Sequence, residues 1–389
     1  MRDRSPRFII LSVVLLSACV GMSRVAASPD TQSDAFGQPC FSGWRRVRIR
    51  EDGSYSGLDA GIGRSGLLIG VADRGKLVAL HCEDASCSAT RRTALSDQLR
   101  SGQFAFWTDA TSLPLAAYES RSTTALKLLD CLDDRCSTFR QTELGEFEYD
   151  TWDIVRHKSD VLVVASTAPN SCDVADLVLL RCANADCSKR TIRTIAKDVR
   201  EGRFAITTSN DTVAVAYVDA LDQAGVYRCN GSFECAQLRF TSARDRGSRT
   251  RAVSVALHPN GQLWLGTLDE SLDTSRSNAS RVKLVRCGTV DCATVQSIDV
   301  EPIDTLRISV SSDGRIIGAL RNTASGVLYT SQCDSVKCGR IDIQKQSGTG
   351  HSIVFGPGGT VQFLSLTSDA IKRTVCTDGR CSHTDIPRF

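Results

Sequence analysis

The chain has 389 residues, of which 41% are hydrophobic and 23% charged, and these ordinary values exclude a disordered chain and a coiled-coil rod. The 47 lysine and arginine residues nearly balance the 44 acidic ones, and no dense basic run occurs, so we expect no nucleic-acid partner. The 17 cysteine residues are more than a reducing compartment favours and predict an exported protein with disulfide bonds.

The N-terminus predicts an export signal. Three arginine residues among the first seven precede an apolar stretch over residues 8–18, which is too short to cross a bilayer as a helix. The sequence LSAC at 16–19 resembles a bacterial lipobox, in which Cys19 would carry a lipid and begin the mature protein. The sequence VAA at 25–27 is the alternative, an ordinary cleavage site. We therefore expect a signal peptide over residues 1–27.

The cysteine residues farther along the chain fall into seven close pairs. Six pairs enclose four residues and one encloses five, and successive pairs begin about 49 residues apart, with a range of 43 to 58. Regular spacing of this size indicates a repeat of one structural unit. The pairs are Cys82/Cys87, Cys131/Cys136, Cys182/Cys187, Cys229/Cys235, Cys287/Cys292, Cys333/Cys338 and Cys376/Cys381.

Each repeat reads as four antiparallel strands. A β-rich run precedes and follows each cysteine pair, as in KLVALHC at 76–82, so each pair should close a hairpin with a disulfide. Upstream lies a second strand pair joined by Asn-Gly, Asp-Gly or Gly-Gly, as at 253–268, 307–320 and 352–366. One such sheet cannot bury both of its faces, so the repeats should pack side by side around an axis. The predicted fold class is all-β, a seven-bladed β-propeller of four-stranded blades.

The predicted propeller covers residues 40–389 and follows a linker over residues 28–39. The segment 40–49 reads as an additional strand that could pair with the last blade and close the ring, although 381–389 already supplies that blade with a fourth strand. The blades are predicted at 51–97, 98–146, 147–197, 198–244, 245–301, 302–346 and 347–389.

Three cysteine residues lie outside the pairs. If Cys19 is lipidated or removed, Cys40 and Cys172 are an even pair, and counting alone suggests a disulfide between them. Their predicted places on opposite faces of the propeller argue against that bond, so both alternatives stay open.

The repeat resembles a known group of proteins. The DG-type turn, a second strand like AYVD, a third strand like LKLLDC and the C-x4-C hairpin resemble the cysteine-hairpin repeats of secreted bacterial β-propeller proteins, which are abundant in myxobacteria. The resemblance covers about residues 40–389 and implies fold and export, but little about activity. The layout is more distantly similar to sialidase-type propellers, yet their Asp-box is absent, and the nearest approach, at 311–318, lacks the aromatic residue.

The paired cysteine residues are predicted to stabilise the fold. Closing each short loop removes about 2 kcal/mol of unfolded-chain entropy, which helps blades that contact only their neighbours. A zinc site is the alternative, but zinc draws cysteine pairs together on one ion, whereas these pairs should lie on separate blades.

Candidate ligand-binding residues come from the first strand of each blade, at the predicted funnel face. Arg203, Arg251 and Arg307 could bind a carboxylate or sulfate, because the guanidinium group is planar and forked, and Trp152 could stack on a sugar. In the alternative interpretation, the arginines pair with acids such as Asp219, Asp269, Glu201 and Asp245 and hold adjacent blades together. The aligned positions are Asp59, Gln103, Trp152, Arg203, Arg251, Arg307 and His351.

Candidate catalytic residues are weaker. A glycosidase needs two carboxyl groups, and a sialidase-like mechanism substitutes a tyrosine nucleophile assisted by an acid. Tyr217 beside Asp219 fits that pattern, and Asp73 and Asp269 are further acids at strand ends, but strand patterning explains each of them better. No metal or cofactor motif occurs, so none is predicted.

The predicted function is an exported binding module at the cell surface or in the periplasm, recognising a carbohydrate or an extracellular protein. It would contact the membrane only through a lipid on Cys19. One alternative is a glycan-active hydrolase or lyase, and another is a structural component of the surface.

Overall fold

The computed structural model describes residues 56–387, apart from short internal gaps. The predicted signal peptide, Cys19, the linker, the strand at 40–49, Cys40 and Cys172 lie outside the described residues. Within the described part, no helix is long and apolar enough to cross a membrane. The gaps are 109–111, 124, 147–148, 168–173, 185–186, 210, 241–247, 259, 272–279, 301–302, 304, 311–314, 323–326, 334–337, 344–348, 357–358 and 378–379.

The described chain is all-β, as predicted, and its sheets are built from strands that follow one another in sequence. Four sheets have four antiparallel strands each. They are β1 (Ser56–Gly63), β2 (Gly66–Asp73), β3 (Lys76–Cys82) and β4 (Thr90–Ser96); β5 (Leu99–Trp107), β6 (Leu115–Ser120), β7 (Ala125–Cys131) and β8 (Phe139–Glu146); β21 (Thr305–Val310), β22 (Ile316–Asn322), β23 (Val327–Cys333) and β24 (Cys338–Ile343); and β25 (Thr349–Phe355), β26 (Val361–Leu366), β27 (Ala370–Thr377) and β28 (Arg380–Pro387).

The other two sheets are larger. One has five strands, because the short β16 pairs in parallel with β20 at its outer edge. Its strands are β16 (Arg239–Phe240), β17 (Ser248–Leu257), β18 (Leu263–Ser271), β19 (Ser280–Cys287) and β20 (Asp291–Val300). The seven-stranded sheet contains β9 (Tyr149–His157), β10 (Asp160–Thr167), β11 (Val174–Cys182), β12 (Arg190–Ser209), β13 (Thr212–Asp219), β14 (Ala224–Cys229) and β15 (Cys235–Gln237).

Strand β12 joins two predicted repeats into this one sheet. Val199 pairs with Ala175 of β11 and also with Asp219 of β13, so strand pairing continues where one repeat gives way to the next. Asp198 (φ 53°) and Gly202 (φ 65°) on either side of it are in the left-handed region and turn the chain there. The register shifts between Val199 and Phe204, which marks the bend between the two halves. The boundary predicted after residue 197 therefore falls inside β12, because the connection between the two repeats keeps its pairing with strands on both sides.

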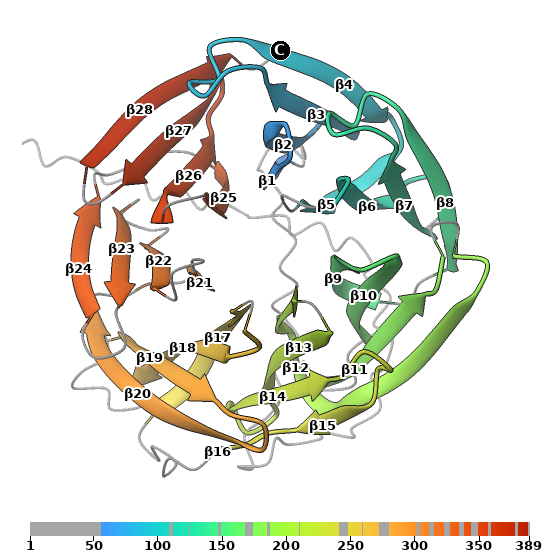
Figure 1. The fold of residues 1–389 in the computed structure, drawn as a ribbon. Helices are drawn as coiled ribbons and strands as arrows, with labels where there is room; N and C mark the ends of the chain where they lie inside the picture. Colours follow the sequence, from blue (N-terminus) through green and yellow to red (C-terminus); the bar gives the residue numbers. More distant parts are fainter. Residues whose placement is uncertain are drawn as a thin grey trace, which may run out of the picture.

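The sheets stand side by side around a central axis, with the first strand of each repeat innermost and the last outermost (Figure 1). The second strands are buried on both faces: six of the eight residues of β2 are buried, whereas β4 has one buried residue. This difference explains why the second strands read as near-continuous apolar runs and the last strands as mixed ones.

Buried hydrophobic clusters lie between neighbouring sheets. One joins the first two sheets through residues such as Leu77 and Phe106, and equivalent clusters follow through the rest of the described chain. The first and last sheets also share a cluster, which contains Val71 and Leu364. In addition, the guanidinium of Arg373 on β27 donates to the carbonyl of Ala85 at 2.7 Å. The last sheet thus packs against the first, and β28 supplies its fourth strand, as predicted.

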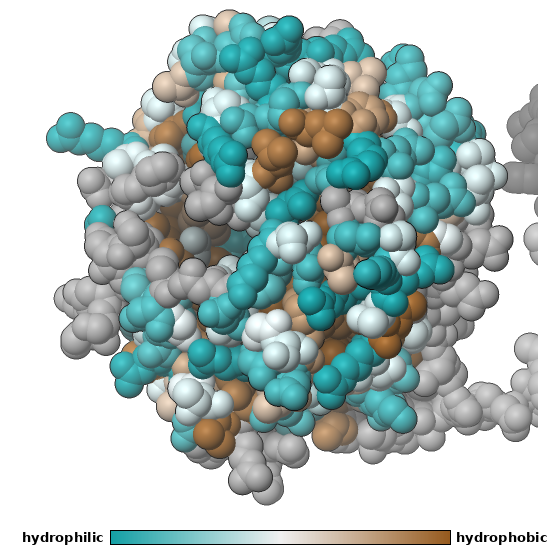
Figure 2. All heavy atoms as spheres, turned by 45° about the vertical axis from the view of Figure 1, so that its right-hand side comes forward, coloured by the Kyte–Doolittle hydropathy of each residue, from teal (hydrophilic) through white to brown (hydrophobic). Residues whose placement is uncertain are grey.

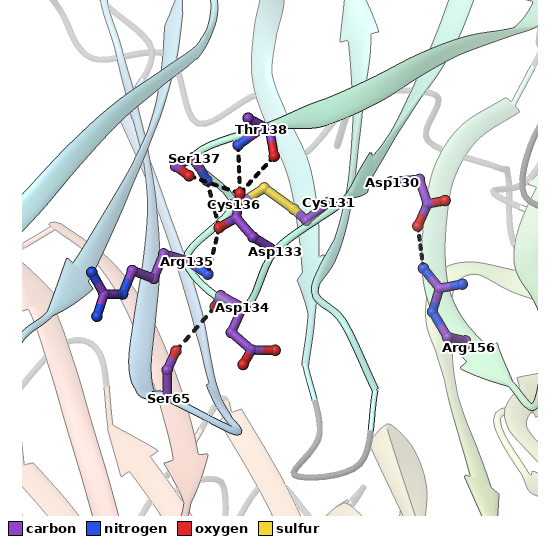
Figure 3. The surroundings of a disulfide bond; sticks show 10 residues. All are labelled: Ser65, Asp130, Cys131, Asp133, Asp134, Arg135, Cys136, Ser137, Thr138 and Arg156. Atoms are coloured by element: carbon purple, nitrogen blue, oxygen red, sulfur yellow. Dashed lines mark hydrogen bonds and ion pairs between the residues drawn. A yellow bond between two sulfur atoms is a disulfide. The ribbon is translucent and has the colours of Figure 1, made fainter.

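Each disulfide closes the hairpin between the last two strands of a repeat, as predicted. In the second sheet, Asp133 fills the loop between Cys131 and Cys136, accepting hydrogen bonds from the backbone and hydroxyl of Thr138, both at 2.7 Å (Figure 3). Cys136 has φ 55°, in the left-handed region, and these hydrogen bonds help to hold that conformation. The described disulfides are Cys82–Cys87, Cys131–Cys136, Cys182–Cys187, Cys229–Cys235, Cys287–Cys292 and Cys376–Cys381.

The pair Cys333 and Cys338 faces across the register of β23 and β24, but its side chains lie outside the described residues. The hairpins also contact their neighbours. The hydroxyl of Ser65, in the first turn of the first sheet, donates to the carbonyl of Asp134 at 3.2 Å, and Arg156 of β9 pairs with Asp130 of β7 (Figure 3). The disulfide hairpins and the first turns therefore lie on the same side of the molecule.

Candidate functional site

The inner strands are linked by hydrogen bonds near the axis. An inner strand has one unpaired edge, so its N–H groups need acceptors from elsewhere. Asp59 of β1 accepts from the backbone N–H of Phe106 on β5 at 2.8 Å, and Ser254 of β17 accepts from that of Ile308 on β21 at 3.0 Å. Ser352 of β25 accepts from the N–H of Ala60 on β1 at 3.1 Å. These three side chains tie β1 to β5, β17 to β21 and β25 to β1.

The same position recurs on every inner strand. Asp59 pairs across its sheet with Gly70, just as Ser254 pairs with Gly266. We call this set of equivalent residues the inner-strand ring. Its members are Asp59, Ala105, Asp153, Ala205, Ser254, Arg307 and Ser352, and their partners on the second strands are Gly70, Ala117, Val164, Ala216, Gly266, Ala319 and Leu364.

This set corrects the alignment made from the sequence. Asp59 and Arg307 belong to the ring as predicted, whereas Asp153, Ser254 and Ser352 take the places expected for Trp152, Arg251 and His351, and Ala105 and Ala205 take those of Gln103 and Arg203. The physical reason is an irregular start to several inner strands. The register shifts between Thr250 and Ala252, between Thr349 and His351, between Leu99 and Phe104, and between Val199 and Phe204.

The charged members of the ring are two aspartates and one arginine, and they are spread around the axis. Asp59 lies on β1, Asp153 on β9 and Arg307 on β21, so at least one other inner strand separates each pair (Figure 1). Figure 2 shows that the molecule is hollowed on the face drawn there, within an otherwise largely hydrophilic surface. Apolar side chains are visible at the hollow as well.

These three charges act on one another. Burial raises the pKa of Asp59 to about 6, opposed by the N–H of Phe106 and by Arg307, while Asp153 adds to the increase. Burial also raises the pKa of Asp153, again opposed by Arg307 and by the N–H of Ile154. Because Arg307 favours the charged form of both carboxyl groups, the three side chains are one electrostatic group.

Asp59 and Asp153 differ in their hydrogen bonds. Both carboxylate oxygens of Asp59 are used: Oδ2 by Phe106, and Oδ1 by Ala60 at 2.9 Å and Ser352 at 3.2 Å. Asp153 accepts from the N–H of Ile154 at 2.8 Å through Oδ1, and among the described residues its Oδ2 has no donor. Asp59 is thus a tie between sheets, whereas Asp153 retains accepting capacity.

Arg203 lies between two repeats. Its guanidinium is 3.4 Å from Asp222 and donates to the carbonyl of Thr250 on β17 at 3.3 Å. Arg200 contacts the same carboxylate at 3.0 Å. The alternative interpretation therefore describes Arg203 better, although the acid is Asp222 rather than Asp219.

Arg251 is also in an ion pair. It lies 3.3 Å from Glu270 on the adjacent strand of its own sheet, and Arg249 approaches the same carboxylate to 2.7 Å. Nearby, the buried Asp269 accepts from the hydroxyl of Thr250 at 2.9 Å and pairs with Lys283 at 2.7 Å. Acids and bases at this end of the sheet are matched to each other.

Trp152 packs against the cluster between the second and third repeats and is half-buried. Its ring thus contributes to the contact between sheets. His351 lies on β25, but its side chain is outside the described residues.

The candidate catalytic residues have structural contacts. Tyr217 is buried, accepts from the side-chain amide of Gln237 at 2.7 Å and stacks on Tyr227, and burial raises its pKa. Asp219 accepts from the N–H groups of Leu221 and Gln223, each at 2.9 Å, and so stabilises the turn after β13. Asp73 ends β2, opposite Lys76 in the register of β3. These contacts favour strand patterning, the interpretation that the sequence also favoured.

Sequence reasoning did not single out Asp153. The available signal was a charged residue inside the strand TWDIV, at a position where its neighbours in the repeat carry alanine or serine.

Comparison with known proteins identifies a class of fold. No family model and no curated protein matches the sequence. Among solved structures, the chain is similar to a puromycin hydrolase, with a TM-score of 0.54 and 13% identity over 87% of this chain and 55% of that one. It is also similar to Hsv2 from Kluyveromyces lactis, with a TM-score of 0.51 and 10% identity over 85% of this chain and 100% of that one.

A puromycin-hydrolyzing peptidase from Mycobacterium tuberculosis has a TM-score of 0.52 and 11% identity, over 88% of this chain and 54% of that one. The chain therefore spans about half the length of the two hydrolases. Identities this low show the fold alone, and that fold is propeller-like. The chain is a disulfide-containing, propeller-like all-β protein.

Proposed function

We propose that the chain is an exported, closed seven-bladed β-propeller that binds a carbohydrate at the inner-strand ring. Dividing β12 at its register shift turns the seven-stranded sheet into two repeats, which supports seven blades in total. The cluster shared by the first and last sheets supports closure. The proposal includes kinship with the cysteine-hairpin propellers of bacteria, on the resemblance of the repeats.

The disulfides support an oxidising compartment. Each described hairpin holds its cystine at a sequence separation of five or six residues, an arrangement that is stable outside the reducing cytosol. An extracellular or periplasmic site agrees with the signal peptide proposed for residues 1–27, and Cys19 is the proposed lipid attachment point.

One observation carries the binding function: Asp153 and Arg307, two charged groups of the inner-strand ring, have no direct partner side chain among the described residues. Carboxylate and guanidinium groups offer planar, paired hydrogen-bonding positions that suit the neighbouring hydroxyls of a sugar. A concave surface with a few convergent polar groups is the usual form of a small-ligand site.

A glycan hydrolase is the second candidate, favoured by the two carboxyl groups with raised pKa values on the ring. An acid near neutral pKa beside a second carboxyl group is what such a reaction requires. Against it, both oxygens of Asp59 accept from neighbours. Release of reducing sugar from a bound glycan, lost in Asp59→Asn and Asp153→Asn, would favour the hydrolase over the binding module.

The test uses the mature chain, exported and purified with its disulfides intact, on an array of acidic and neutral glycans. We expect selective capture that is lost in Arg307→Gln. Arg251→Gln is the matched control, because it removes the same charge from an ion pair at the surface. Silence across the whole array, with folding verified by circular dichroism, would reject carbohydrate binding and direct attention to protein ligands.

A further inference from the structure

We infer that the ligand of the inner-strand ring is a carboxylated sugar, whose carboxylate binds Arg307 and whose hydroxyls donate to Asp153. This inference rests on the proposed carbohydrate-binding function and specifies its substrate class.

Arg307 differs from the other arginines at which the sequence pointed. Arg203 and Arg251 are both engaged by acids of their surroundings, Asp222 and Glu270. Arg307 is exposed on an inner strand, and among the described residues it has no ion pair within 4.0 Å. The charge of Arg307 is balanced only at longer range, by Asp59 and Asp153. Its guanidinium is therefore suited to an external carboxylate, which it can bind through two parallel hydrogen bonds.

Asp153 determines what the ligand must offer beside its carboxylate. Its Oδ1 is fixed by the N–H of Ile154, which orients the carboxylate, and its Oδ2 has no donor among the described residues. A ligand at this oxygen must therefore donate a hydrogen bond. A sugar hydroxyl does so without adding charge.

The positions between the two groups are small and uncharged. Asp153 on β9 and Arg307 on β21 are separated along the ring by Ala205 and Ser254. In the described part of the chain, Ser254 accepts from Ile308 and makes no hydrogen bond to Asp153 or Arg307, and Ala205 offers no polar side-chain group, so neither residue satisfies the two charged groups. One ligand that carries an anion at one end and hydroxyls at the other would satisfy both charged groups together.

Asp59 sets the limit on the charge of the ligand. Both oxygens of its carboxylate already accept hydrogen bonds, from Phe106, Ala60 and Ser352, so we expect Asp59 to act on the ligand mainly through its charge. Two aspartates against one arginine leave the ring negative by one unit when all three are ionised. We therefore expect a ligand with a single carboxylate at the ring to bind better than a polyanion held by charge alone.

The experiment measures binding by isothermal titration of two probes, galacturonate, which carries one carboxylate, and its methyl ester. The ester keeps the hydroxyls and removes the negative charge. We expect the mature protein to bind the acid at least tenfold more tightly than the ester. Arg307→Gln should abolish that preference by weakening the acid at least tenfold and leaving the ester almost unchanged.

Asp153→Asn should weaken both acid and ester, because it affects the hydroxyl end, and the ester by the larger factor, because the change also removes a negative charge that opposes the carboxylate of the acid. Arg251→Gln, the matched loss of a surface charge, should leave both affinities unchanged, and thermal unfolding verifies that each variant is folded.

Different results would overturn the preference for a carboxylated sugar and carbohydrate binding itself. Equal affinity for acid and ester, with both reduced in Asp153→Asn, would overturn the carboxylate inference and leave carbohydrate binding in place. Binding of acid and ester that neither Asp153→Asn nor Arg307→Gln reduces would overturn the site. No binding of either probe, or of any glycan on the array, would overturn both.

Discussion

Replacing Asp59 with asparagine should change how stability depends on pH. In the folded protein the pKa of Asp59 is raised to about 6, from an ordinary value of 3.8, because burial disfavours the carboxylate. The native state therefore holds the proton more tightly than the unfolded chain between these values, and stability falls as the pH rises from about 4 to 6. Asparagine has no proton to lose, so Asp59→Asn should lack this decrease.

The size of the expected change in stability follows from the shift in the pKa of Asp59. A difference of about two pKa units corresponds to about 3 kcal/mol, which is an upper figure because Asp59 keeps some exposed surface. A chain of 389 residues has an unfolding entropy of about 0.8 kcal/mol/K, so the variant should gain up to about 4 °C on the wild type between pH 4 and pH 7.5. The absolute stability of the variant is less informative, since its amide nitrogen would face the N–H of Ala60.

The assay is thermal unfolding of the oxidised protein at pH 4, 5, 6 and 7.5, followed by circular dichroism. Glu83→Gln, which removes the charge of an exposed carboxylate, is the control for net charge. Other acids such as Asp84, whose pKa is lowered by the hydroxyls of Ser86 and Ser88, act in the opposite direction, so only the difference between variant and wild type is interpreted. A difference that is constant with pH would refute the assignment of a desolvated carboxyl group to Asp59.

Three further substitutions test the packing and the surface contacts. Gly70→Ala would place a Cβ atom 2.6 Å from the ring of Phe104 and should lower the free energy of unfolding by about 1–3 kcal/mol. Gly63→Ala is the control and should lower it much less, because the nearest atom to a Cβ there is 3.9 Å away. Asp133→Ala removes five hydrogen bonds from a disulfide hairpin and should lower the unfolding free energy by about 1–2 kcal/mol, with Asp134→Ala as a milder neighbour. Arg203→Gln should lower the melting temperature without changing glycan capture, and a loss of capture with unchanged stability would return Arg203 to the binding site.

The sequence was sufficient for the all-β class, the strand pairs and the disulfide hairpins because the signals for them are local. Cysteine spacing and the Asn-Gly and Gly-Gly turns predicted the strand pairs at 253–268 and 352–366, which appear as β17–β18 and β25–β26. It was insufficient for the equivalence of inner-strand residues, because a bulge moves the count by one or more residues without leaving a mark in the sequence. Counted from its start, which contains the bulge between Thr250 and Ala252, β17 does not reveal that Ser254, and not Arg251, contacts the next inner strand.

The partners of the arginines could not be predicted either, since they depend on contacts between repeats. Asp222 lies in the turn after β13. That turn folds back toward Arg203 on β12, whose guanidinium also contacts the carbonyl of Thr250 on β17, and this folding brings Asp222 and Arg203 together. Sequence distance carried no information on which acid, Asp219 or Asp222, would be nearer.

Some residues of the inner-strand ring hold neighbouring inner strands together, and others do not. The backbone N–H of the next inner strand requires a hydrogen-bond acceptor, and the uncharged hydroxyls of Ser254 and Ser352 provide one. Asp59 provides one as well but pays a desolvation penalty. Arg307 cannot accept a hydrogen bond at all, and the Oδ1 of Asp153 turns back to its own neighbour, Ile154. Within the residues that the structure describes, Asp153 and Arg307 make no hydrogen bond to the next inner strand and occupy equivalent positions, so they are the residues at which binding is to be sought.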